Sequence, residues 1–300
     1  MKMKHYILFV SIFSLLALMC VLVIFTEPRE QMSQTEESYW EQQINTLGGV
    51  GALEKFADAV VSLNANEQHL KAHMFGGALY DQLGAKGISV CDTRFSYGCF
   101  HELLGRAIAE LGLSSLAELN DVCIDRLGED AHFCQHGLGH GIQTYFGYTQ
   151  ADVRDAMRVC KDLPHNDAIG GCAGGIFMEY NFRTMLAEDG EVRQDDNIFT
   201  PCDTLEKGAM SSCFFWQSEW WYAHLSHNEM YNDFHTLGKY CEKVVNKYGE
   251  AFRELCFRGI GNVTPQASNF NLQKSRQLCA EVSDTAQDVS NCIQQAETFF

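Results

Sequence analysis

SLAELNDVCIDRLGEDAHFCQHGLGHGIQTYFGYTQAD, residues 115–152, contains the pattern that is repeated along this chain. Two helix-forming stretches, 115–127 and 131–147, flank the turn Gly128–Glu129–Asp130 and hold one cysteine each, Cys123 and Cys134. The stretch therefore predicts a helical hairpin. Because its cysteines face each other across the turn, a disulfide within the hairpin is geometrically natural.

Local signals predict where the helices of this hairpin and the next one begin and end. Ser115 to Glu118 has the form of a capping box, which predicts a helix start, and Thr149 to Asp152 predicts the start of the following helix. That following helix should run through Cys160 and stop before Pro164, because proline breaks the hydrogen-bonding pattern of a helix.

The cysteines show that the hairpin recurs. Of thirteen cysteines, one (Cys20) lies in an apolar N-terminal stretch. The other twelve form six successive pairs: Cys91/Cys99, Cys123/Cys134, Cys160/Cys172, Cys202/Cys213, Cys241/Cys256 and Cys279/Cys292. Second cysteines recur every 35 to 43 residues, a period typical of helical repeats. The sequence thus predicts an all-α domain over residues 39–300, built from disulfide-stapled hairpins in a curved α-solenoid or α/α array.

The first residues predict the compartment. Lys2 and Lys4 precede an apolar run from Tyr6 to Phe25, long enough to cross a bilayer. We expect a cytoplasmic tail (1–5), a transmembrane signal anchor (6–25), a stalk or linker (26–38) and a remainder in the periplasm or a lumen, since basic residues stay on the cytoplasmic side. A cleaved signal peptide is the alternative. The membrane is then one partner of the chain, through its N-terminal helix.

Composition narrows the function classes. The formal net charge is −17, and without Lys2 and Lys4 it becomes −19 on the exported part, which argues against nucleic acid or anionic lipid as a partner. A hydrophobic content of 46% excludes general disorder. Regularly paired cysteines favour an oxidising compartment over a cytosolic metal-thiolate site.

Histidines occur at one repeated helical position. Three of them precede a predicted helix-ending glycine by eleven residues: His73, His101 and His136, before Gly84, Gly112 and Gly147. His69 and His140 lie four residues from His73 and His136, so each pair shares a helical face. Neighbouring helices pack 8–10 Å apart, close enough for their imidazoles to share one ion.

This register predicts two metal-ligand clusters, one of His69, His73 and His101 and one of His136, His140 and Glu179. In a tightly curled array they would merge into a dinuclear site. Glu179 is the candidate catalytic residue, as a ligand, a general base or a group that orients a histidine. The ligand set suits zinc, iron or copper. A hydrogen-bonded polar seam is the alternative.

Three further residues are candidates for a substrate pocket. Trp216 and Trp220 lie four residues apart on a later helix and are predicted to wall a pocket over the metal, with ordinary core packing as the alternative. Arg258 occupies the position of His101 and His136 in a later repeat. We expect it to bind a substrate carboxylate or to form a surface ion pair.

Two functional hypotheses follow. The first is a membrane-anchored, extracytoplasmic metalloprotein, an enzyme that uses a transition metal bound by histidine and glutamate for hydrolysis or oxidation. The second is a non-catalytic scaffold whose concave surface binds a peptide or protein partner, as repeat arrays do.

Overall fold

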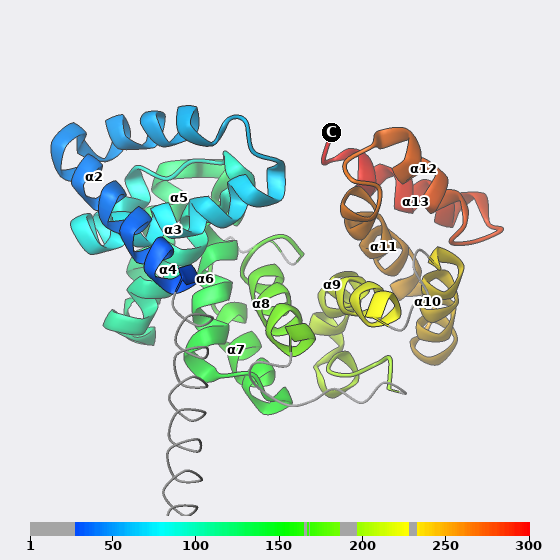
Figure 1. Ribbon diagram of the computed structural model, residues 1–300. Helices are drawn as coiled ribbons and strands as arrows, with labels where there is room; N and C mark the ends of the chain where they lie inside the picture. The colour runs from blue at the N-terminus through cyan, green and yellow to red at the C-terminus, as the bar shows by residue number, and fades with distance from the viewer. Residues whose placement is uncertain (1–27, 165–166, 168, 187–196, 228–232) are drawn as a thin grey trace, which may run out of the picture.

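The structure is a computed structural model, and residues 28–164, 167, 169–186, 197–227 and 233–300 are described. Every regular element within these ranges is a helix, which confirms the all-α prediction. Figure 1 shows the helices as a curved series, with α2 at one end and α12 and α13 at the other.

The α-helices are α2 (Pro28–Val60), α3 (Ala65–Leu83), α4 (Gly98–Leu111), α5 (Leu116–Leu127), α6 (Ala131–Phe146), α7 (Gln150–Lys161), α8 (Cys172–Leu186), α9 (Lys207–His227), α10 (Phe234–Tyr248), α11 (Arg253–Ala267), α12 (Leu272–Ala280) and α13 (Ala286–Glu297). Short 3-10 turns cover Gly84–Ser89, Phe95–Tyr97, Leu113–Ser115, Gly128–Asp130, Cys202–Thr204 and Glu250–Phe252. Helix α2 is interrupted at Gly48, whose φ of 73° is not helical.

The glycines that define the histidine register do end helices. Gly84, Gly112 and Gly147 follow α3, α4 and α6, with φ values of 58°, 72° and 107°. Positive φ is readily adopted by glycine, so each glycine lets the chain leave its helix sharply. The prediction that these three glycines end helices is therefore confirmed.

Of the two predicted helix caps, one is confirmed and one was wrong. Thr149 accepts a hydrogen bond from the backbone of Asp152, whose carboxylate accepts one from the Thr149 backbone. Ser115 makes no such cap, because a 3-10 turn precedes α5 and holds Ser115 in a helical conformation. Its hydroxyl donates instead to the carbonyl of Gly112.

All six predicted disulfides are present: Cys91–Cys99, Cys123–Cys134, Cys160–Cys172, Cys202–Cys213, Cys241–Cys256 and Cys279–Cys292. Four join the two α-helices of a hairpin. The first and fourth differ, because Cys91 follows a 3-10 turn and Cys202 begins one. Before Cys91 the expected helix is therefore a short turn, whereas most of the segment expected to form the helix before Cys202, residues 187–196, lies outside the described residues.

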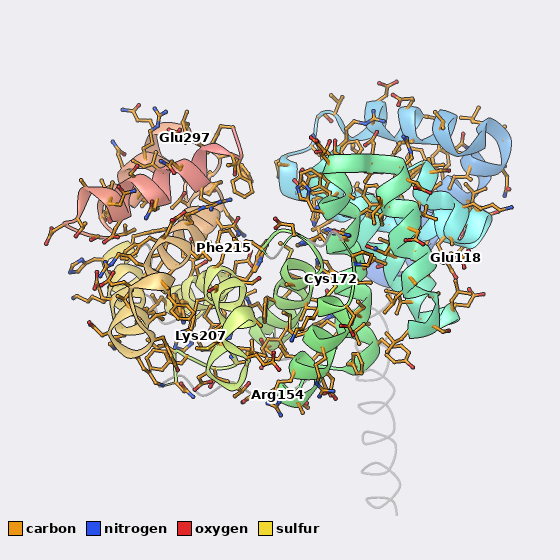
Figure 2. The ribbon with its side chains drawn as sticks, turned by 180° about the vertical axis from the view of Figure 1, so that it is seen from behind. Glu118, Arg154, Cys172, Lys207, Phe215 and Glu297 are labelled. Carbon is orange, nitrogen blue, oxygen red and sulfur yellow. A yellow bond between two sulfur atoms is a disulfide. The ribbon has the colours of Figure 1, made fainter. Side chains whose placement is uncertain are left out.

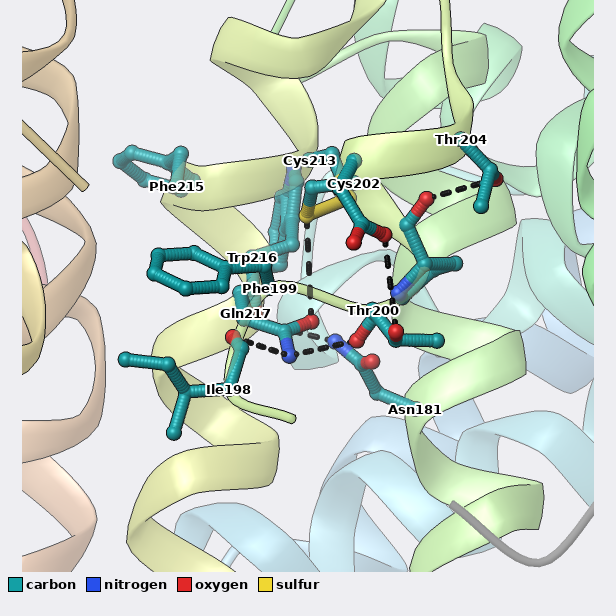
Figure 3. Close-up of a disulfide and its surroundings, with 12 residues drawn as sticks. Asn181, Ile198, Phe199, Thr200, Cys202, Thr204, Cys213, Phe215, Trp216 and Gln217 are labelled. Carbon is teal, nitrogen blue, oxygen red and sulfur yellow. Dashed lines mark hydrogen bonds between the residues drawn. A yellow bond between two sulfur atoms is a disulfide. The ribbon is translucent and has the colours of Figure 1, made fainter. Parts of the chain in front are cut away.

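Polar side chains hold the short turn at Cys202 in place (Figure 3). Gln217 on α9 donates a hydrogen bond of 2.9 Å to the carbonyl of Thr200. Asn181 on α8 donates one of 2.8 Å to the carbonyl of Trp216. These buried bonds tie α8, the turn and α9 together, so the series of helices continues through the short unit.

The second helices of successive hairpins pack against one another in chain order: α3 on α4, α4 on α6, α6 on α8, α8 on α9, α9 on α11 and α11 on α13. Glycines permit close approach at these contacts. A Cβ added to Gly139 would overlap the carbonyl oxygen of Cys172, and one added to Gly259 would overlap that of Phe215. Cys172 accordingly lies in the middle of the molecule in Figure 2.

The predicted tail and membrane anchor, residues 1–25, lie outside the described residues. Among the helices that are described, none has the length and apolar character needed to cross a membrane. The predicted linker, 26–38, is helical from Pro28 onward. Glu36 pairs with Lys71 at 2.7 Å and Glu37 with Arg106 at 2.7 Å, so this part of α2 is bound to α3 and α4.

Candidate metal centre

Three neighbouring helices bring five imidazoles together. Successive ring centroids lie 4.6 Å apart for His69 and His73, 4.9 Å for His73 and His101, and 4.3 Å for His101 and His140. His136 completes the series, 5.0 Å from His140. The helix contacts α3–α4 and α4–α6 produce this convergence.

Two overlapping groups within this series have the geometry to hold a metal ion. One contains His69, His73 and His101, and the other contains His101, His136 and His140. In each group the ligand atoms lie within 4.8 Å of one another. The second group is fully buried, whereas His69 and His73 are only half-buried. His101 belongs to both groups.

In the buried group, His136 and His140 are held in fixed orientations. His136 donates its Nδ1 hydrogen to the carbonyl of Gly170 at 3.0 Å. The Nδ1 of His140 lies 2.9 Å from a carboxylate oxygen of Glu179. The two Nε2 atoms are then 3.2 Å apart and face each other. Both rings therefore direct the same nitrogen toward a common point.

Glu179 is an ionised carboxylate that lies behind His140. Burial raises its pKa, but hydrogen bonds from His140, Arg183 and Tyr148 outweigh burial and lower the pKa to about 2. Tyr148 donates to its second oxygen at 3.0 Å, and Arg183 does so at 3.1 Å. Of the three roles considered for Glu179, this position fits that of a group that orients His140.

The half-buried group has a similar arrangement. His69 donates its Nδ1 hydrogen to the carbonyl of Phe95 at 2.9 Å, and its Nε2 lies 3.0 Å from Nε2 of His73. The loop Phe95–Tyr97 has three successive positive φ values, 59°, 49° and 63°, uncommon for residues other than glycine. This loop aims the Phe95 carbonyl at His69 and so fixes the orientation of the ring.

Burial favours the neutral form of His73, His101 and His136. It lowers the pKa of His73 to about 3 and, together with neighbouring histidines, lowers the pKa of His101 well below 6.5. Burial has the same effect on the pKa of His136. Neutral imidazole is the form that binds metal ions, so these histidines are ready ligands at neutral pH.

The nitrogen separations suit coordination. Metal–nitrogen bonds of about 2.0–2.1 Å at tetrahedral angles place two ligand nitrogens roughly 3.3 Å apart. The facing nitrogens here are separated by 3.0 Å in His69 and His73 and by 3.2 Å in His136 and His140. Both separations are close to that value.

The three predicted pocket residues have different positions. Trp216 is buried, its ring centroid 5.6 Å from that of His136, and its indole nitrogen donates to the carbonyl of Ile169. Trp220 is also buried and stacks on His224. Arg258 donates to Gln295 on α13, and no contact among the described residues joins it to the histidines. The structure thus brings only Trp216 to the centre.

Sequence reasoning missed the groups that orient the histidines. The carbonyls of Phe95 and Gly170 come from loops, and their positions depend on the fold. Arg183 follows Glu179 by four residues, the spacing of a helical ion pair, and could have been found from the sequence. Tyr148 had no comparable signal.

No protein-family model, curated protein or solved structure matches this chain.

Proposed function

We propose that this protein is a membrane-anchored, extracytoplasmic metalloprotein in which His101, His136 and His140 hold a transition-metal ion. The observation that carries the proposal is the pair of facing Nε2 atoms of His136 and His140, 3.2 Å apart, on rings that are both bonded through Nδ1.

The positions of the imidazole hydrogens determine what the two facing Nε2 atoms can bind. A carbonyl oxygen can only accept, so His136 carries its hydrogen on Nδ1. The ionised carboxylate of Glu179 likewise requires the hydrogen of His140 on Nδ1. In neutral rings both Nε2 atoms are then bare lone pairs that repel each other. A proton between them would require an imidazolium, which burial disfavours at His136. A metal ion binds both lone pairs and requires no imidazolium.

An ion in this position would serve as a Lewis acid or a redox centre, which supports an enzyme of hydrolytic or oxidative chemistry with zinc, iron or copper. In this proposal Glu179 keeps His140 in its orientation, as carboxylates commonly do for metal-bound histidines. Trp216 covers one side of His136 and limits the access of water.

Six disulfides support an oxidising compartment outside the cytoplasm. The apolar run from Tyr6 to Phe25 supports anchoring in a membrane. We also infer that the hairpins form a repeat array, since their second helices pack in chain order and glycines occur at these contacts.

The test is metal analysis of the full-length protein, produced in an oxidising compartment and purified in detergent. Loaded with Zn²⁺ and dialysed, the wild type should retain stoichiometric zinc. The double variant His136→Ala/His140→Ala should lose the ion of the buried group. His132→Ala is the matched control, because His132 lies on the same helix and its Nδ1 bonds to the carbonyl of Glu129 and not to another histidine.

Circular dichroism distinguishes loss of metal from loss of fold. If the double variant does not fold, zinc content is measured in the milder variant His140→Gln instead. Equal zinc content in the wild type and His140→Gln would contradict the proposal. Wild-type protein that retains no zinc, copper or iron would also contradict it, and would favour a scaffold that binds a peptide or protein partner.

A further inference from the structure

His101 lies between the two groups of histidines and contacts both. Its Nδ1 is 3.1 Å from Nε2 of His73 on one side. On the other side its ring stacks on His140, with centroids 4.3 Å apart, and lies 5.1 Å from the ring of His136. Helix α4 brings it there, because α4 packs between α3 and α6.

The second nitrogen of His101 is unsatisfied. Nε2 is buried and has no hydrogen-bond partner, unlike Nδ1. Buried polar atoms without a partner are rare and destabilising. In a ring surrounded by four other imidazoles, such an atom indicates a ligand that completes its bonding.

Glycines at the helix contacts make this central position of His101 feasible. A Cβ added to Gly98 would lie 2.6 Å from the carbonyl oxygen of His69, and one added to Gly137 would lie 2.8 Å from that of Phe100. Larger residues at either position would separate α4 from α3 or from α6. His101 would then be too far from one of the two groups.

We propose that the protein holds two transition-metal ions bridged by His101, which binds one ion with His69 and His73 through Nδ1 and the other with His136 and His140 through Nε2. This inference rests on the proposed function and extends it. One nitrogen lone pair binds one ion, so two ions that share this ring require both nitrogens. The bridging ring releases its single N–H proton to solvent when the second ion binds, and becomes an imidazolate.

The two ions differ in their access to solvent. His136 and His140 are 6% and 8% exposed, whereas His69 and His73 are half-buried. Three protein nitrogens leave a position open on a four-coordinate ion. The ion at His69 and His73 is therefore the one that binds an exogenous ligand, and small anions such as azide are suitable probes of it.

The test uses the full-length protein loaded with Cu²⁺ and studied by metal analysis and electron paramagnetic resonance. The wild type should bind two copper ions per chain with a weak resonance, because an imidazolate bridge couples the two spins. His73→Ala should bind one copper ion and show the full signal of an isolated Cu²⁺. Azide should alter the optical spectrum of the wild type and leave that of His73→Ala unchanged.

His132→Ala is again the control, and should behave as the wild type. If His73→Ala does not fold, His73→Gln replaces it. Two ions with independent, full-intensity signals would overturn the bridge, and one ion that persists in His73→Ala would overturn the second site while leaving the proposed function intact. Wild-type protein without bound copper would overturn the bridge, and zinc retained by the same protein would leave the proposed function intact.

Discussion

Two halves of the chain are built in the same way but differ in their polar side chains. One is the histidine-bearing half (α3–α8), and the other is the C-terminal half (α9–α13). Both use disulfides between neighbouring segments and glycines where second helices touch. Two residues after the second cysteine, α4 and α6 have His101 and His136, whereas α9 and α11 have Phe215 and Arg258.

The same contrast appears six residues after the second cysteine. His140 occupies this position on α6, and Glu219 and Asn262 occupy it on α9 and α11. The Asn262 amide donates to Glu219 at 3.1 Å. Cysteines and glycines therefore maintain the backbone in both halves, and a few positions within each second helix decide the chemistry.

From this comparison we expect matched core substitutions to lower the free energy of unfolding equally in the two halves, but to lower metal affinity only in the histidine-bearing half. Phe100 and Phe257 each follow the second cysteine of their unit and are fully buried. Replacing either with alanine should lower the free energy of unfolding by about 3–5 kcal/mol, measured by chemical denaturation. Only Phe100→Ala should also weaken metal binding, since Phe100 adjoins His101. Equal metal affinity in the two variants would show that the halves are not specialised in this way.

The two halves also place a glutamate in opposite environments. Burial raises the pKa of Glu219 to about 8, although the Asn262 hydrogen bond partly opposes it, whereas the pKa of Glu179 is lowered to about 2. Between about pH 4.5 and 8 the folded state keeps the Glu219 proton and the unfolded state has lost it. This contribution to stability is therefore complete below pH 4.5 and decreases as pH rises through 8.

The corresponding measurement is the free energy of unfolding against pH for the wild type and Glu219→Gln. The variant should lose the part of the pH dependence due to Glu219, up to about 1.4 kcal/mol per pH unit in this window. Identical slopes for the two proteins would refute the assignment of Glu219 as a neutral buried acid.

Glycine contacts give a third comparison of the halves. Gly139→Ala and Gly259→Ala should each lower the free energy of unfolding by about 1–3 kcal/mol, because the added methyl group overlaps a neighbouring carbonyl and separates two helices. Metal titration should detect a further defect only for Gly139→Ala, which precedes His140. Unchanged thermal midpoints in both variants would mean that the helices can move apart freely.

The last comparison concerns the orientation of one proposed metal ligand, His140. Glu179→Gln should weaken zinc binding roughly 10- to 100-fold, since loss of a carboxylate partner lets the His140 ring turn. Glu219→Gln is the matched control in the other half and should bind zinc as the wild type does. Competition with a chromophoric chelator measures both affinities, and a result of no change for Glu179→Gln would remove Glu179 from the centre.

The sequence by itself determined the all-α class, the six cysteine pairs and the histidine register. These features are local: a cysteine pair is separated by 8 to 15 residues, and a glycine ends a helix through its own backbone freedom. A capping box is less reliable, as Ser115 shows, because a preceding 3-10 turn was enough to change the backbone geometry.

Only the tertiary structure decided how the histidines meet. The sequence placed His101 in one cluster, but its contacts with both neighbours depend on the packing of α4 between α3 and α6. Arg258 occupies the position equivalent to His101 and His136, yet its guanidinium donates to Gln295 on α13 and lies 3.9 Å from the carboxylate of Glu254, as the ion-pair alternative predicts. Which residues share one face of a helix follows from its repeat of about 3.6 residues, so the sequence shows it. Whether side chains of different helices meet depends on how closely the helices pack and at what angle they cross. Glycines and loop carbonyls that are distant in sequence establish this packing.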